Sequence, residues 1–203
     1  MKNLKLLLLS VLLLSMISCK RSAESYFKEA TDSLHEGNFK IAESLYNKAI
    51  ELKPDYAFAI ANRGFARFGL SNYKGSLTDY EKAISLDSLL KKNSYYVIAC
   101  DKHGLKDYSG ALQDFEKAIS LEPKKAANYA ARADTKKEMN DLQGALNDYD
   151  KAIALNPGNK IYYIFRGLLK NDLKDKNGAC IDLKKARQLG DKSAEGWMYG
   201  ICN

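Results

Sequence analysis

The residues able to perform covalent or metal chemistry are few in this sequence of 203 residues. It contains two histidines, His35 and His103, and four cysteines, none of which stand at the Cys-x-x-Cys spacing of a zinc or redox site. It contains neither a glycine-rich phosphate loop nor the HExxH and GxSxG patterns of metalloproteases and hydrolases. We therefore predict no catalytic residue, no metal site and no cofactor.

Paired carboxylates such as Asp148 and Asp150 are common in general acid–base sites, but here they belong to a phrase that recurs along the chain. A catalytic site occurs once per chain, so we interpret these acidic residues as structural or surface features. Versions of the phrase DFEKAISLEP begin at Leu45, Asp79, Asp114, Asp148 and Asp182.

The alanine that follows the lysine in each copy of this phrase gives the repeat period. The intervals between its copies are 34, 35, 34 and 34 residues by subtraction, which is the range of helical repeat arrays. A second small residue stands seven places before each of these alanines. The first set is Ala49, Ala83, Ala118, Ala152 and Ala186, and the second set is Ala42, Ser76, Ala111, Ala145 and Ala179.

Small residues seven apart lie on one face of a helix, two turns from each other, and let a partner helix approach closely. A large residue between them, such as Tyr46 or Phe115, fills the remaining space. The three prolines, Pro54, Pro123 and Pro157, each stand just after a copy of the phrase, where proline ends a helix. The phrase is therefore the second helix of a helical hairpin.

A first helix and a polar turn precede each copy. We predict that one Asn or Asp in each turn is a turn or N-cap residue. These residues are Asn38, Asn72, Asp107, Asp141 and Asp175.

Five copies in register resemble the tetratricopeptide-repeat family, and the likeness covers residues 23 to about 190. The resemblance implies an all-α fold, a right-handed superhelical solenoid with a concave groove. Ser88 stands where the second copy should have its proline, and one residue is added there, so we expect an irregular joint. The expected repeats are 23–56, 57–91, 92–125, 126–159 and 160–190, followed by a capping helix at 191–203 that covers the open end.

The first 18 residues differ in character from the repeats. Two lysines precede an apolar run of nine residues from Leu6 to Leu14, which is far shorter than the roughly 20 residues of a membrane span. Because Cys19 directly follows a stretch of small residues, this segment resembles the signal peptide of bacterial lipoproteins. The resemblance implies that Cys19 is lipidated and that residues 19–22 form a short tether. An ordinary secretory signal with an incidental cysteine is the alternative.

Such an anchor would hold the protein in the bacterial cell envelope. Lys20 follows the cysteine, where an aspartate would retain an enteric lipoprotein in the inner membrane. The outer membrane is therefore predicted over the inner membrane. Because sorting rules differ between bacterial groups, the sequence alone leaves this choice open.

Three cysteines remain after Cys19. Cys180 and Cys202 flank the joint between the last repeat and the capping helix. In an exported protein they could form a disulfide across 22 residues, contributing about 3 kcal/mol in the loop-entropy model. Sequence alone leaves their oxidation open. We interpret Cys100 as a small residue of the third repeat.

The charge of the chain argues against nucleic-acid binding. The formal net charge is +7, and it falls to +5 (7 − 2) when Lys2 and Lys5 are removed with the first 18 residues. The remaining charges are dispersed along the helices, without a basic run or interleaved aromatic residues. A solvated surface explains this pattern, and nucleic acid is not a predicted partner.

The resemblance also places recurring first-helix positions in the concave groove, where the second and third repeats are rich in aromatic residues. The predicted contact surface is Phe58, Phe65, Phe68, Tyr96 and His103. Such a surface suits an apolar peptide or an amphipathic helix. The alternative is that about half of these rings pack in the core between repeats.

The sequence therefore predicts a non-catalytic scaffold that binds another protein or peptide in its groove, with self-association left open. One alternative is a structural accessory of an outer-membrane assembly or secretion machine, working through its convex face. An enzyme or enzyme accessory acting on envelope polymers is the other alternative. That function would require a constellation around His103 and Asp134.

Overall fold

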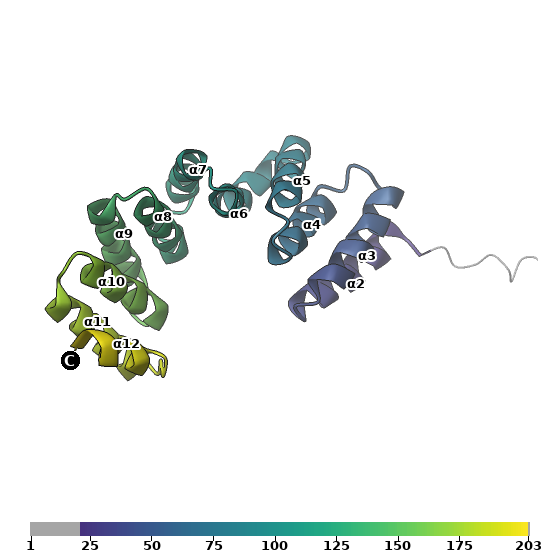
Figure 1. The fold of residues 1–203 in the computed structure, drawn as a ribbon. Coiled ribbons are helices and arrows are strands. Elements are labelled where there is room, and N and C mark those ends of the chain that lie inside the picture. The colour runs from purple at the N-terminus through teal and green to yellow at the C-terminus, as the bar shows by residue number, and fades with distance from the viewer. Residues whose placement is uncertain (1–20, 203) are drawn as a thin grey trace, which may run out of the picture.

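The computed structural model describes residues 21–202, and Figure 1 shows these as an open arc of antiparallel helices. Within this range the chain forms eleven α-helices and one short 3-10 helix, with no strand. The predicted signal peptide and lipidation site, residues 1–18 and Cys19, lie outside the described residues. No helix in the described part is long and apolar enough to span a membrane.

Ten of the helices form five hairpins, and the all-α repeat solenoid predicted from the sequence is confirmed. The 3-10 helix η1 stands between the second and third hairpins, and α12 follows the fifth. The helices are α2 (Ala23–His35), α3 (Phe39–Leu52), α4 (Ala57–Gly69), α5 (Tyr73–Leu86), η1 (Ser88–Leu90), α6 (Lys91–Gly104), α7 (Tyr108–Leu121), α8 (Ala126–Glu138), α9 (Leu142–Leu155), α10 (Lys160–Asp172), α11 (Lys176–Gln188) and α12 (Ala194–Cys202).

The recurring small residues are the points where the two helices of a hairpin cross. All ten residues of the two sets are buried. On the facing first helix, a Cβ atom added to Gly64 would lie 3.1 Å from the Tyr80 ring, and one added to Gly167 would lie 3.2 Å from the Ala179 carbonyl oxygen. Backbones this close tolerate only small residues, which explains why these positions recur in the sequence.

The turn between the two helices is capped by the predicted polar residue in four hairpins. The side chains of Asn72, Asp107, Asp141 and Asp175 each accept a hydrogen bond from the backbone N–H three residues later. In the first hairpin, the Asn38 side chain makes no such cap bond and its amide instead donates to Glu36. Asn38 thus occupies the predicted N-cap position of α3, but without a capping side-chain hydrogen bond.

A buried carboxylate on the second helix is paired with a cation from the first helix in the last four hairpins. Asp148, for example, is 5% exposed and accepts hydrogen bonds from the Arg132 guanidinium at 2.7 and 2.8 Å. Lys136 adds an ion pair at 2.8 Å. The corresponding buried carboxylates are Asp79, Asp114, Asp148 and Asp182. The acidic residue that opens the phrase is thus an internal ion-pair partner, and the exposed Asp150 bonds Arg166 of the next repeat.

The joint between the second and third hairpins is irregular, as the missing proline predicts. The chain leaves α5, forms η1 and enters α6 without a break. The Asp87 carboxylate accepts a hydrogen bond from the Leu89 N–H at 2.9 Å, and Leu90 is buried. The joint is therefore a packed and capped element.

Candidate binding groove

A pocket lies at the middle of the array, where three successive hairpins meet. Its volume is about 280 Å³. It draws residues from five consecutive helices, α4 to α8. The lining residues are Phe68, Tyr73, Tyr96, Cys100, His103, Gly104, Phe115, Ala131 and Asp134.

The structure divides the five predicted groove residues into two groups. Phe68, Tyr96 and His103 come together in the pocket wall, and each is partly buried. Phe58 and Phe65 do not line the pocket; they stand on α4 with 53% and 42% of their surface exposed. The Phe65 ring is stacked beside the Phe68 ring at a centroid distance of 6.5 Å. The prediction of an aromatic contact surface at these residues stays a prediction.

Two ring pairs form the apolar walls of the pocket. Phe68 and Tyr73, from the second hairpin, have centroids 5.9 Å apart, and Tyr96 and Phe115, from the third, have centroids 6.1 Å apart. Gly104 makes room for the Tyr73 ring, because a Cβ atom added there would lie 2.7 Å from it. The walls are therefore fixed by packing between neighbouring hairpins.

Sequence reasoning did not place Tyr73 and Phe115 in this surface. Phe115 is the ring that fills the hairpin interior, and Tyr73 is the first residue of α5. One sequence signal could have located Tyr73, namely the glycine that ends the first helix of the next hairpin. Gly69 accommodates Phe39 in the same way that Gly104 accommodates Tyr73.

The polar side chains of the pocket are Asp134 and His103. The Asp134 carboxylate accepts a hydrogen bond from the Tyr149 hydroxyl. His103 Nδ1 lies 3.0 Å from the Thr135 hydroxyl, and its ring is edge-on to Tyr108 at 5.3 Å. Burial raises the pKa of the Asp134 carboxyl above its ordinary value, against the opposing effect of the Tyr149 hydrogen bond.

The Cys100 thiol faces the same pocket, three residues before His103. Its burial raises its pKa to about 12. A nucleophilic cysteine needs a lowered pKa, because the thiolate is the reactive form. The side chains of Cys100, His103 and Asp134 are therefore close together without the activation that a catalytic triad requires.

The possible metal ligands do not cluster. Among residues 21–202, no group of three or more His, Cys, Asp or Glu side chains is arranged to hold a metal ion.

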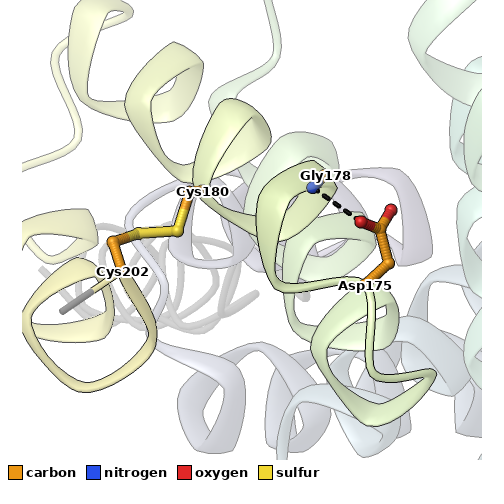
Figure 2. Close-up of a disulfide and its surroundings, with 4 residues drawn as sticks. All are labelled: Asp175, Gly178, Cys180 and Cys202. Carbon is orange, nitrogen blue, oxygen red and sulfur yellow. Dashed lines mark hydrogen bonds between the residues drawn. A yellow bond between two sulfur atoms is a disulfide. The ribbon is translucent and has the colours of Figure 1, made fainter.

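The two remaining cysteines meet at the far end of the array. Cys180 of α11 and Cys202 of α12 are joined by a disulfide, with Cα atoms 5.6 Å apart. Figure 2 shows this bond beside the start of α11, where the Asp175 carboxylate accepts a hydrogen bond from the Gly178 N–H at 2.8 Å. The capping helix begins at Ala194, later than the expected residue 191, because Asp191 accepts hydrogen bonds from the backbone and hydroxyl of Ser193 in a turn.

The family model described as "Tetratricopeptide repeat" matches three of the hairpins, at residues 23–56, 93–125 and 126–159. The chain carries tetratricopeptide repeats. The second and fifth hairpins of this tetratricopeptide-repeat array share the buried small residues and the capped turns of the matched ones.

Known proteins with this architecture are distant in sequence. The solved structure of MamA from Desulfovibrio magneticus RS-1 has a TM-score of 0.73 and 19% identity, covering 82% of this chain and 94% of that one. The structure of YrrB, titled a TPR protein with an unusual peptide-binding site, has a TM-score of 0.65 and 19% identity, covering 89% and 93%. Identities this low show the fold alone.

A curated relative has a higher identity over a short stretch. RNA polymerase II-associated protein 3 of Xenopus laevis is 52% identical over 50 residues, which is 25% of this chain. The match spans only 8% of the length of that relative. It therefore marks a shared repeat segment.

Proposed function

We propose that this protein is a non-catalytic scaffold that binds a segment of another protein in its concave groove. The tetratricopeptide-repeat fold supports an interaction scaffold, and YrrB of the same fold is described as having a peptide-binding site. The observation that carries the proposal is the aromatic pocket at the centre of the array, together with the exposed rings of Phe58 and Phe65 on α4, the helix that also carries the pocket residue Phe68.

Two large aromatic rings, those of Phe58 and Phe65, are exposed on α4. Phe58 and Phe65 stand seven residues apart, so they lie on one face of α4. The Phe65 ring is stacked beside the Phe68 ring, so it extends the pocket wall along the helix. A partner segment that covered all three rings would remove a continuous apolar surface from water, which is the main source of affinity in such grooves.

The chemistry of the pocket supports binding over catalysis. The raised pKa of Cys100 keeps its thiol protonated at neutral pH. His103 and Asp134, the pair that an enzyme acting on envelope polymers would need, make their hydrogen bonds to Thr135 and Tyr149. Both side chains are therefore held by the scaffold.

The proposed cellular setting is the bacterial cell envelope, with the protein anchored through a lipid on Cys19. The support is the sequence pattern of residues 1–19, with Lys20 favouring the outer membrane. Because α2 begins at Ala23, the tether would be short and the first hairpin would lie near the membrane surface.

A crosslinking pull-down from intact membranes tests the groove. The full chain is compared with a Phe58→Ala, Phe65→Ala, Phe68→Ala variant, and we expect the variant to lose the captured envelope protein. Because Phe68 is partly buried, a Phe58→Ala, Phe65→Ala variant serves as a second test that leaves the packing intact.

A matched control changes apolar residues that are equally exposed but lie outside the pocket. Ile41 on α3 and Ile181 on α11 are 55% and 67% exposed, so an Ile41→Ala, Ile181→Ala variant should capture the partner normally. If the groove variants retain the partner and this control loses it, the groove proposal is wrong. The convex-face accessory would then be favoured.

A further inference from the structure

The central pocket combines aromatic walls with one carboxylate. Phe68 and Tyr73 come from the second hairpin, Tyr96 and Phe115 from the third, and Asp134 from the fourth. Aromatic faces attract a cation through their quadrupole, and a carboxylate attracts it through charge and hydrogen bonding. We propose that this pocket binds a basic side chain, lysine or arginine, that projects from the partner polypeptide. The inference rests on the proposed function and names the anchor residue of the bound segment.

One oxygen of the Asp134 carboxylate is available to accept a hydrogen bond from a ligand. One oxygen, Oδ1, accepts from the Tyr149 hydroxyl, and the second accepts no hydrogen bond from any residue between 21 and 202. The side chain is partly buried, and this burial raises the pKa of the carboxyl. A carboxylate drawn away from water with an unfilled oxygen gains more from a cationic donor than from an apolar or anionic ligand.

The neighbouring cations offset its charge only in part: His103 and Lys137 lower the pKa of the Asp134 carboxyl, but burial keeps that pKa above its ordinary value. Lys137, one turn along α8, forms an ion pair with Asp172 of the next hairpin at 3.3 Å. His103 on α6 is held by Thr135, and Glu138 on α8 adds a further negative charge that raises the Asp134 pKa. The other titratable groups that interact with this carboxylate are Tyr149 on α9 and Tyr96 and Cys100 on α6. The Lys125 ammonium already lies 5.5 Å from the centre of the Tyr96 ring. The electrostatic balance of the pocket therefore favours an incoming cation.

The volume of the pocket suits a single amino-acid side chain. The volume of about 280 Å³ lies below the roughly 300 to 1,000 Å³ of sites that enclose a whole small molecule. Lysine and arginine carry an aliphatic stem that can lie against rings and a charged head that can reach a carboxylate. An apolar side chain would contact the walls and leave the second oxygen of Asp134 without a hydrogen-bond donor.

The test uses the full chain in detergent micelles with ¹³C-labelled alanine methyl groups. The probes are the N-acetyl methylamides of lysine, arginine, norleucine and glutamate. Ala131 lines the pocket and Ala194 lies at the far end of the array, so the two methyl signals separate pocket binding from nonspecific effects. We expect lysine and arginine probes to shift the Ala131 signal with millimolar affinity, at least about tenfold tighter than norleucine.

Two matched variants assign the effect to one carboxylate. Asp134→Asn keeps an oxygen for the Tyr149 hydroxyl and removes the charge, so it should weaken the lysine probe about tenfold and leave norleucine unchanged. Asp32→Asn makes the same change at an exposed carboxylate of the first hairpin that does not line the pocket, and it should leave both probes unchanged. Binding of lysine should also weaken as the pH is lowered, because protonation of Asp134 removes the charge.

Equal binding of lysine and norleucine, tighter binding of glutamate, or no Ala131 response at tens of millimolar would overturn the proposal. The pull-down separates this failure from that of the scaffold function. If Asp134→Asn still captures the partner that the Phe58→Ala, Phe65→Ala variant loses, groove binding stands and the basic anchor is wrong. If the unmodified chain captures no partner while the lysine probe binds, the pocket stands and the scaffold function fails.

Discussion

At the scale of single residues, the least expected feature is Asp101 of α6. Its side chain is fully buried, and neither carboxylate oxygen makes a hydrogen bond to a described residue. The Ser76 hydroxyl of α5, also buried, is likewise without a hydrogen bond in the described range. Burial raises the pKa of the carboxyl to about 7, against the opposing effect of the neighbouring Ser76 hydroxyl. Asp101 therefore destabilises the contact between the second and third hairpins whenever it is charged.

The pH dependence of stability follows from this shift. Between about pH 4 and pH 7 the folded chain retains a proton that the unfolded chain has lost, so the free energy of unfolding falls as the pH rises. The other titratable side chains whose charges interact with Asp101 are Tyr80 and Cys100. We expect Asp101→Ala to flatten this fall and to stabilise the protein by about 2 to 4 kcal/mol at pH 8. Ala66 already occupies the equivalent place on α4, where it is buried.

Urea unfolding at pH 5 and pH 8 measures the effect. Asp32→Ala is the control, because Asp32 holds the same position on α2 and is exposed. If the free energy of unfolding falls between pH 5 and pH 8 as much in Asp101→Ala as in the unmodified protein, Asp101 is not the group responsible.

At the scale of an element, the start of the second helix depends in four of the five hairpins on a pair of residues, an Asn or Asp and a glycine three places later. In α9, Asp141 Oδ1 accepts from the Gly144 N–H at 2.9 Å, and a Cβ atom added at Gly144 would lie 2.0 Å from Asp141 Oδ2. The carboxylate covers the glycine, so the residue at that place must lack a side chain. Glycine at position 144 therefore allows the Asp141 side chain to make its N-cap hydrogen bond.

We expect Gly144→Ala to lower the free energy of unfolding by about 1 to 2 kcal/mol, the usual cost of a lost N-cap. Gly196→Ala is the matched control, because nothing lies within 4 Å of an added Cβ there. It should be neutral or stabilising by up to about 1 kcal/mol, since alanine favours helix over glycine. Chemical denaturation of the two variants compares them, and a change of the same sign in both would contradict the cap argument.

At the scale of the whole molecule, the solenoid has an end that must be covered. The helix α12 covers this end. Ala194 is the one buried residue of α12, and the disulfide between Cys180 and Cys202 joins α12 to α11. The α12 helix carries the single tryptophan of the chain, Trp197, which is 49% exposed. The bond and the helix together form the C-terminal boundary of the core.

We expect Cys202→Ser to release α12 and to lower stability by up to about 3 kcal/mol, the loop-entropy value for a link of this separation. Trp197 fluorescence should shift toward longer wavelength, because an undocked α12 exposes the ring to water. A reducing agent should produce the same shift in the unmodified protein and no further shift in the variant. A Trp197 signal that is insensitive to both changes would show that packing alone holds α12.

Much of this architecture was readable from the sequence. Its repeat period, its crossing positions and four of its five turn caps are local patterns that depend on residues a few places apart. Asn38 occupies the predicted position without the cap bond, and three places later it is followed by Ile41, where the other four copies have a glycine. The exposed Phe58 and Phe65 were also predictable, since helical spacing places them on one face.

The pocket, by contrast, was decided by tertiary structure. Tyr73, Phe115 and Asp134 lie far apart in the chain and meet only because successive hairpins stack on one another. The same stacking buries Asp101 against α5, while its counterpart Asp32 stays exposed. Local sequence determines which residues form each helix and where two helices of a hairpin touch. Which side chains from different hairpins share one environment depends on how the hairpins pack, since burial and charge are properties of that shared space.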